Sequence, residues 1–304
     1  VLDIGSNTVH LLVADVHPGG RPLATSSTRT VLRLMRYLEP DGSISEEGVD
    51  ALVSAVAEAR VVAERENVSE LLATATSAVR DATNGAEVIA RIEEALGQDL
   101  QVLGGESEAR FTFLAVRRWF GWSAGQILLF DIGGGSLELA AGADELPEVA
   151  ASVPLGAGRA TVEFLPNDPP GEEAVERLRA HAAVTLAPIA ALMAAQPKPN
   201  HVVGSSKAIR SLAKLAGYPA AGWSATQLVL PRERLAAAAA LVRDGVTGAA
   251  GLSALDALEV LARDIDETRE RDDWFLALAA ARNRVTDEAR EAVEVAMRIV
   301  GARA

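Results

Sequence analysis

The chain has 304 residues, of which 49% are hydrophobic, and a formal net charge of −13. This length predicts two domains, each with enough apolar residues for its own core. The absence of cysteine excludes disulfides and thiolate metal sites. The acidic balance argues against general nucleic-acid binding, which needs a basic face. Neither a membrane-spanning apolar run nor a leader peptide is visible, so we expect a cytoplasmic protein with no membrane partner.

The first third of the chain alternates predicted strands and helices. A hairpin is expected over 2–16 and a third strand within 29–38. A capping box at Ser43–Glu46 predicts the start of a helix, and Gly97 predicts the end of another. The remaining elements expected here are a strand at 71–74, a helix at 84–96, a strand at 100–103 and a helix at 106–116.

The second half repeats this order. Strands are expected at 127–130, 137–140 and 148–153, followed by a helix at 172–193, a strand at 201–203 and a helix from Ser206 to Leu215. We place the domain boundary near 120–125, which gives domains at 1–122 and 123–304. From about residue 218 the pattern predicts only amphipathic helices, at 232–243, 253–269 and 286–300. This tail either repacks the second domain or leaves its sheet a strand short. The fold class is α/β, with two similar domains and a cleft between them.

A similar glycine-containing phrase occurs once in each half, between two apolar strands. The copies are Asp3-Ile4-Gly5-Ser6-Asn7-Thr8 and Asp131-Ile132-Gly133-Gly134-Gly135-Ser136. Glycine permits a tight turn, and successive backbone N–H groups in such a turn can face one concavity and hold phosphate. Three consecutive glycines are costly in backbone entropy, which makes a purely structural turn the poorer interpretation. Two such turns suggest that two like domains grip one phosphorylated ligand, and Asp3 could orient the first turn or hold a water molecule there.

These phrases, with three further passages, identify a family resemblance. The further passages are Ala75 to Asn84, Gly105-Glu106-Ser107-Glu108-Ala109-Arg110 and Leu155-Gly156-Ala157-Gly158-Arg159. In this order the chain resembles the exopolyphosphatase and guanosine pentaphosphate phosphohydrolase (Ppx/GppA) family, in its short two-domain branch. That family lies within the actin-like (ribonuclease H-like) superfamily of sugar kinases, Hsp70 and actin. The resemblance covers roughly residues 1–215 and implies two actin-like domains with the active site in the cleft between them.

The resemblance implies a catalytic role for Glu108 and for Arg80. Glu108 would be the general base that activates the attacking water, although an acid is also favoured at a helix N-terminus without any function. Arg80 would contact phosphate, where its planar fork fits well; the alternative is a surface arginine on a helix. Asn84 could serve phosphate too, but we favour a helix-capping role for it.

The remaining implied sites hold metal and phosphate. Asp131 and Glu138 share one face of the predicted hairpin and could ligate Mg2+, with Mn2+ as the alternative; otherwise Glu138 is an outward-facing strand residue. Gly204 and Ser205, with Ser206 and Lys207, form a third candidate phosphate loop at a strand-to-helix junction, or Ser205 or Ser206 caps that helix.

The activity that this resemblance implies is hydrolysis of a terminal phosphoanhydride by in-line attack of water. The expected substrate is inorganic polyphosphate, with guanosine pentaphosphate (pppGpp) as the close alternative. A kinase or ATPase of the same superfamily is disfavoured, because the loop at Gly204 lacks a second glycine. A non-catalytic polyphosphate or alarmone sensor stays open because of the atypical tail, and the resemblance also allows a homodimer.

Overall fold

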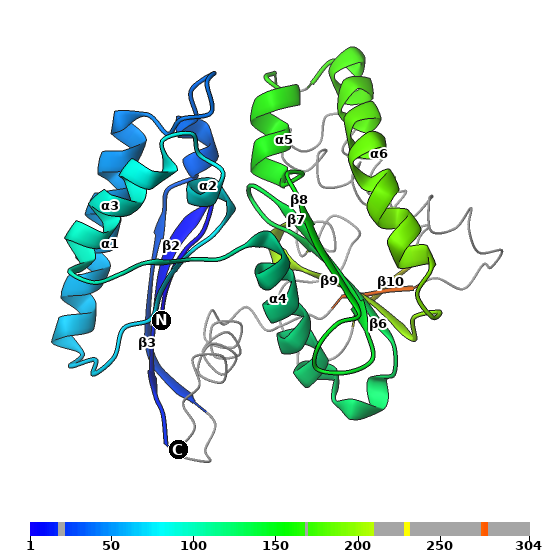
Figure 1. The fold of residues 1–304 in the computed structure, drawn as a ribbon, viewed down its shortest axis with the longest axis horizontal. Helices are drawn as coiled ribbons and strands as arrows, with labels where there is room; N and C mark the ends of the chain where they lie inside the picture. Colours follow the sequence, from blue (N-terminus) through cyan, green and yellow to red (C-terminus); the bar gives the residue numbers. More distant parts are fainter. Residues whose placement is uncertain (18–21, 168–169, 210–227, 232–274, 279–304) are drawn as a thin grey trace. The chain divides into compact units, whose positions relative to one another are not determined.

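The structure is a computed structural model. It describes residues 1–17, 22–167, 170–209, 228–231 and 275–278. These residues form two compact units, the first at 1–104 and the second from residue 105 onward. Each unit is built on one sheet with helices packed against it (Figure 1). In this part of the chain, no helix is both long enough and apolar enough to cross a membrane.

The first unit contains a five-stranded mixed sheet in the order β3-β2-β1-β4-β5. The strands β1, β2 and β3 are antiparallel neighbours, whereas β4 lies parallel to β1 and β5 parallel to β4. Their bounds are β1 Leu2–Ile4, β2 Thr8–Asp15, β3 Leu23–Val31, β4 Ala73–Ala75 and β5 Gln101–Val102. The third strand thus begins earlier than the expected range of 29–38.

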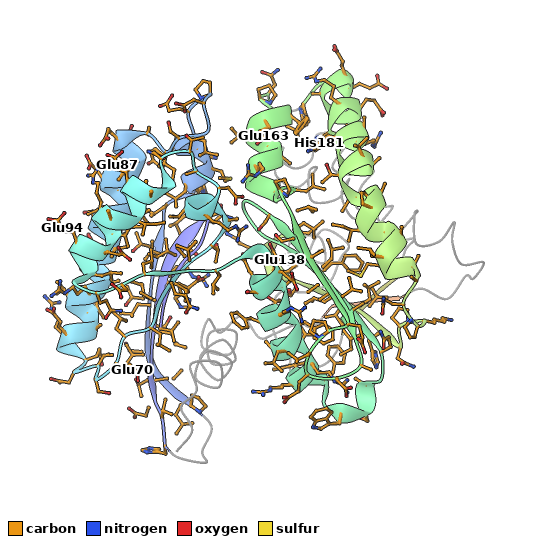
Figure 2. All side chains as sticks on the ribbon, in the orientation of Figure 1. Glu70, Glu87, Glu94, Glu138, Glu163 and His181 are labelled. Carbon is orange, nitrogen blue, oxygen red and sulfur yellow. The ribbon has the colours of Figure 1, made fainter. Side chains whose placement is uncertain are left out.

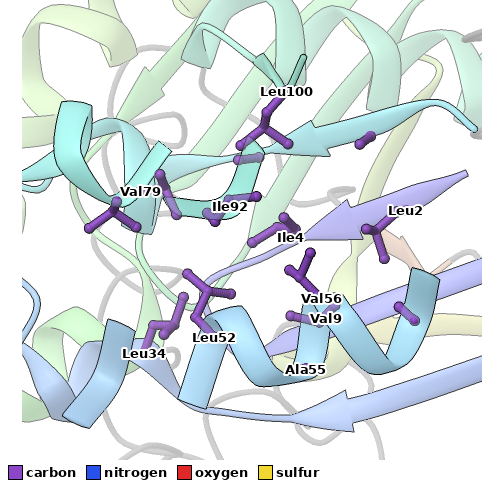
Figure 3. Packing of buried hydrophobic residues seen from close by; sticks show 14 of the residues in the cluster. Leu2, Ile4, Val9, Leu34, Leu52, Ala55, Val56, Val79, Ile92 and Leu100 are labelled. Atoms are coloured by element: carbon purple, nitrogen blue, oxygen red, sulfur yellow. The ribbon is translucent and has the colours of Figure 1, made fainter. Parts of the chain in front are cut away.

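Helices α1 (Glu46–Arg65) and α3 (Gly85–Leu96) supply most of the helical core of the first unit. Leu52 and Val56 of α1 and Ile92 of α3 pack with Leu2 and Ile4 of β1, and all five are almost completely buried (Figure 3). Burial of such side chains stabilises by about 1.5–3 kcal/mol each. The short elements η1 (Leu34–Tyr37) and α2 (Ser77–Arg80) connect this core to the sheet.

Two predicted helix boundaries have different outcomes. Gly97 ends α3 in the left-handed conformation, with φ of 69°, as predicted. The prediction of a capping box that begins at Ser43 was wrong. The N-cap of α1 is Ser45, whose side chain accepts a hydrogen bond from Gly48 N at 3.3 Å. Ser43 instead binds Asp41 in the preceding turn.

The second unit repeats the strand order of the first. Its sheet runs β8-β7-β6-β9-β11-β10, with β6, β7 and β8 antiparallel and β9 parallel to β6. The bounds are β6 Ile127–Ile132, β7 Leu137–Gly142, β8 Val149–Val153, β9 His201–Ser205, β10 Leu228–Pro231 and β11 Phe275–Leu278. Strand β11 lies parallel to β9. The sheet is therefore not a strand short, which corrects that interpretation of the tail.

Both faces of the second sheet are covered by helices. Phe113 and Val116 of α4 (Gly105–Phe120) pack with Ile127 and Leu129 on one face, and the short η2 (Trp122–Ala124) follows α4. Leu128 and Phe130 face the opposite side, against α5 (Ala157–Phe164) and α6 (Glu172–Ala194) (Figure 1). Two-sided burial explains why β6 reads as a continuous apolar run. Because α4 packs on this sheet, the compact units separate at Gly104 and Gly105, whereas we expected the domain boundary after residue 122.

Most of the expected C-terminal helices fall outside the described residues. This holds for the helices predicted at 232–243, 253–269 and 286–300. Only the start of the helix predicted from Ser206 is described, over residues 206–209.

Candidate functional site

The first glycine turn connects β1 to β2. Gly5 N donates to Thr8 O at 2.9 Å, which closes the turn. The carbonyl of Ser6 accepts from Leu34 N at 2.8 Å, and the carbonyl of Asn7 accepts from the amides of Leu32 and Arg33. Among the described residues, no acceptor is present for the backbone N–H groups of Ser6 and Asn7. These two donors are therefore available to an anion.

The helix α2 begins beside this turn. Ser77 Oγ lies 3.0 Å from Ser6 Oγ in a buried hydroxyl pair, and Thr76 N donates to Ile4 O at 3.1 Å. Arg80, at the end of α2, donates from Nη1 to Leu103 O at 2.8 Å and from Nε to Asp81 at 3.0 Å. Its side chain is 22% exposed, and its role in phosphate binding stays a prediction.

Asn84 occupies the N-cap position of α3, but its side chain makes no capping hydrogen bond. Its side-chain oxygen accepts from Ile44 N at 2.9 Å, and its side-chain nitrogen donates to Ile44 O at 2.8 Å. The expected side-chain cap was therefore wrong. Asn84 instead ties the start of α3 to the segment that precedes α1.

The strands on either side of the first turn place Asp3 opposite His10. Burial raises the pKa of Asp3 to about 6, and the nearby positive charge of Arg29 opposes this shift. Burial also lowers the pKa of His10 to about 4, and Arg29 acts in the same direction. His10 Nε2 lies 2.9 Å from Ser27 Oγ on β3. At neutral pH the pair is thus an ionised aspartate opposite a neutral imidazole.

The second glycine turn connects β6 to β7 and is closed in the same way. Gly133 N donates to Ser136 O at 2.9 Å. Its carbonyls are bound by the start of α5, because Ala157 N donates to Gly133 O and Arg159 N donates to Gly134 O, both at 2.9 Å. Within the described segments, the N–H groups of Gly134 and Gly135 have no acceptor, so they match Ser6 and Asn7 of the first turn.

Two carboxylates lie beside the second turn. Asp131 and Glu138 are register partners on β6 and β7, so both side chains leave the same face of the sheet. Glu138 lies on β7 of the second unit (Figure 2). It is only 2% exposed and accepts a hydrogen bond from Ser152 Oγ at 2.9 Å. Asp131 accepts from Ser205 Oγ at 2.6 Å. Glu138 is therefore not the outward-facing residue of the alternative interpretation.

The donor set fits a hard cation. Two carboxylates directly opposite each other repel unless a cation or a proton compensates them. Mg2+ typically takes one or two carboxylates and completes its shell with water and substrate phosphates. No cluster of three or more histidine, aspartate or glutamate ligands occurs in the described parts of the chain. The assignment of Asp131 and Glu138 as metal ligands stays a prediction.

Glu108 lies in the first turn of α4 and is half-buried. The other acid of that turn, Glu106, forms an ion pair with Arg110 at 2.6 Å. Glu108 belongs to the second unit, with Asp131 and Glu138, whereas Arg80 belongs to the first. The role of Glu108 as general base stays a prediction.

The third candidate loop follows β9. Ser205 contacts Asp131, as described above, whereas Ser206 Oγ accepts from Ile209 N at 3.4 Å in the manner of a helix cap. Ser206 has φ of 91°, a conformation that costs energy for a residue other than glycine. Gly204 is paired in register with Phe130, and Lys207 is exposed. The loop thus supplies a hydroxyl to the carboxylate pair.

Several residues that contact these turns had no expected role in the sequence. They are Ser77, Ser152, Gly156 and Arg159. Sequence position does not predict their contacts, because each meets a turn or a carboxylate from a distant element. Of these four residues, Ser77, Gly156 and Arg159 did lie within passages that carry the family resemblance, whereas Ser152 did not.

Comparison with known proteins identifies the family of this chain. The model of the Ppx/GppA phosphatase family matches residues 12–238. The chain belongs to the Ppx/GppA phosphatase family. Exopolyphosphatase 1 of Mycobacterium tuberculosis is 52% identical over 217 residues, which cover 71% of this chain and 63% of that protein. Exopolyphosphatase 1 of Mycobacterium leprae is 51% identical over the same length and is covered to 64%. This Ppx/GppA chain therefore aligns with less than two thirds of these curated relatives.

Solved structures show the same fold. An exopolyphosphatase from Cytophaga hutchinsonii superposes with a TM-score of 0.78 at 22% identity, covering 97% of this chain and 96% of the other. The Aquifex aeolicus Ppx/GppA protein superposes with a TM-score of 0.73 at 22% identity, covering 100% of this chain and 98% of the other. The predicted α/β fold is confirmed for this Ppx/GppA chain, because these solved structures share it over nearly their whole length.

Proposed function

We propose that this chain removes the terminal phosphate of inorganic polyphosphate by hydrolysing a phosphoanhydride bond. Both glycine turns would bind the same phosphate chain through their backbone N–H groups. The observation that carries the proposal is the second turn, where free N–H donors and the Asp131–Glu138 carboxylate pair lie on adjoining residues. The names of the mycobacterial relatives support polyphosphate as the substrate.

Each site residue has a chemical role in this proposal. Glu108 accepts the proton of the attacking water. Arg80 and the turn N–H groups stabilise the negative charge on the transferring phosphoryl group. Asp131 and Glu138 would hold Mg2+, or Mn2+, which when bound supplies positive charge to the phosphate oxygens. Ser205 orients Asp131 through its hydroxyl, and the loop of Gly204 and Ser205 would add a third contact to phosphate.

Two related functions use the same residues. Hydrolysis of pppGpp needs identical chemistry at its terminal phosphate. A polyphosphate or alarmone sensor would keep the turns and dispense with Glu108. We propose that the protein acts in the cytoplasm, which suits a chain without cysteine, and that it functions alone or as a homodimer.

The deciding experiment is phosphate release from polyphosphate, pppGpp and ATP, measured in parallel with and without Mg2+. We expect Mg2+-dependent release from polyphosphate. Faster release from pppGpp would reassign the substrate. Binding of polyphosphate without release from any of the three would favour the sensor.

A further inference from the structure

We propose that Arg159 is a positioning residue that holds the second glycine turn in its phosphate-binding shape. The inference deepens the proposed function and rests on it, because it concerns the same turn. It assigns Arg159 no contact with substrate. Its basis is the set of hydrogen bonds between the start of α5 and the carbonyl groups of the turn.

Three successive carbonyls of the turn are bound by residues of α5. Gly133 O accepts from Ala157 N at 2.9 Å, and Gly134 O accepts from Arg159 N at 2.9 Å. Gly135 O accepts from Arg159 Nε at 2.8 Å. Arg159 thus holds two of the three carbonyls, one through its backbone and one through its side chain.

These bonds also fix where the N–H groups of the turn point. In a planar trans peptide, the carbonyl of one residue and the N–H of the next point in opposite directions. Because α5 holds the carbonyls of Gly133, Gly134 and Gly135, the N–H groups of Gly134, Gly135 and Ser136 point away from α5. By holding the carbonyl of Gly135, the side chain of Arg159 fixes the direction of the N–H group of Ser136.

The first turn achieves the same result without a side chain. The residue that matches Gly135 there is Asn7, and its carbonyl accepts backbone N–H bonds from Leu32 and Arg33. In the second turn, a guanidinium takes the place of those amides. The carbonyl of Gly135 thus depends on a side chain, whereas the matching carbonyl of Asn7 is held by backbone groups.

The surroundings of Arg159 favour a fixed guanidinium. Its side chain is only 15% exposed, and Nη1 lies 3.7 Å from Glu163 Oε1 on the next turn of α5. A hydrogen bond from a cation to a carbonyl is stronger than one between neutral groups. Three glycines in a row have no side chains to restrict them, so they depend on such external contacts.

The test compares Arg159→Ala and Arg159→Lys with two controls. Glu163→Gln removes the ion pair but leaves the bond to Gly135, and Arg177→Ala removes an exposed arginine of α6 that pairs with Glu173. The first readout is amide hydrogen exchange of Gly133 and Ala157 in the substrate-free protein. The second is KM and kcat for polyphosphate with Mg2+.

We expect faster exchange at Gly133 and Ala157 in Arg159→Ala and unchanged exchange in both controls. KM should rise about ten- to a hundredfold, as expected for loss of a charged hydrogen bond, with a smaller change in kcat. Arg159→Lys keeps the charge but not the Nε donor. Its exchange rates and its KM should therefore lie between those of the alanine variant and those of the wild type. If Arg159→Ala does not fold, Arg159→Lys carries both readouts.

Two results would overturn the inference. Unchanged exchange and unchanged KM would mean that Arg159 does not hold the turn. A raised KM with unchanged exchange would mean that Arg159 acts through its charge alone. The exchange readout needs no turnover, so it tests Arg159 even if the wild-type protein hydrolyses none of the substrates, an outcome that would count against the proposed function only.

Discussion

Gly156, in the loop between β8 and α5, lies directly against Gly135 of the second glycine turn. A Cβ atom at Gly156 would lie 2.5 Å from the carbonyl carbon of Gly135 and 2.5 Å from Ser136 N. Both neighbours are backbone atoms of the second glycine turn and cannot rotate away as a side chain can. Any side chain at position 156 must therefore displace the turn itself.

We expect Gly156→Ala to abolish most phosphate binding and to destabilise the protein by about 1–3 kcal/mol, as overpacking typically does. Polyphosphate affinity by calorimetry and unfolding by urea would measure the two effects. The control is Gly171→Ala, because a Cβ at Gly171 meets nothing within 4 Å. Full affinity in Gly156→Ala would show that the turn tolerates displacement.

The carboxylate pair predicts a specific dependence on metal. Ser152 Oγ donates to Glu138, which orients this proposed Mg2+ ligand. Loss of such a supporting hydrogen bond typically weakens metal binding about 10- to 100-fold. We therefore expect Ser152→Ala to need a correspondingly higher Mg2+ concentration for half-maximal phosphate release, with little change in the rate at saturating Mg2+.

Ser27 provides the matched control in the first unit. Its hydroxyl holds His10, which lies opposite Asp3 as Glu138 lies opposite Asp131. Ser27→Ala should leave the Mg2+ dependence unchanged if the metal belongs to the Asp131–Glu138 pair. An equal shift in both variants would contradict that assignment.

Asp3 and His10 predict opposite effects of pH on stability. The folded-state pKa of Asp3 is raised from 3.8 to about 6, so its contribution to stability is largest at low pH and is lost as pH rises through 6. The folded-state pKa of His10 is lowered from 6.5 to about 4, so its contribution is present above 6.5 and is lost as pH falls toward 4. Between about pH 4 and 6 the two effects largely offset each other.

Substitution of Asp3 should remove its contribution to the pH dependence of stability and leave that of His10. We expect Asp3→Asn to be more stable than the wild type at pH 8, by up to about 3 kcal/mol, and to approach the wild type near pH 4. Urea unfolding across this pH range would test the difference, with the exposed Asp15→Asn as control. A constant difference at every pH would mean that Asp3 is not the titrating group.

Elements with a strong local signal could be predicted from sequence. Gly97 at the end of α3 requires a left-handed backbone and lies where predicted. The two glycine-containing turns also lie where predicted, between two strands in each unit. The two-sided burial of β6 likewise matches its apolar run. Local chemistry and tertiary structure agree at these positions, so sequence alone was sufficient.

Other features depend on contacts that a sequence pattern does not contain. Strand β3 is mostly exposed and polar, so it lacks the alternation that marks a strand. Asn84 had the residue type of a helix cap, but Ile44 offered its side chain two backbone partners. Arg159 reaches Gly135 only because α5 packs on the turn, which no spacing along the chain reveals.

The same limit applies to Glu108, whose catalytic role rests on resemblance. We expect Glu108→Gln to lower kcat for polyphosphate about 10²- to 10⁴-fold, because the amide cannot accept the proton of the attacking water. KM and Mg2+ dependence should change little, since neither the turns nor the carboxylate pair is altered. Steady-state phosphate release would measure all three.

Glu106→Gln is the matched control for Glu108→Gln. It removes an acid from the same first turn of α4, so it repeats any general effect on the helix N-terminus. Because Glu106 is already paired with Arg110, its loss should leave kcat within a few-fold of the wild type. A wild-type rate in Glu108→Gln would assign the base elsewhere, and equal losses in both variants would mean that Glu108 acts only through the helix.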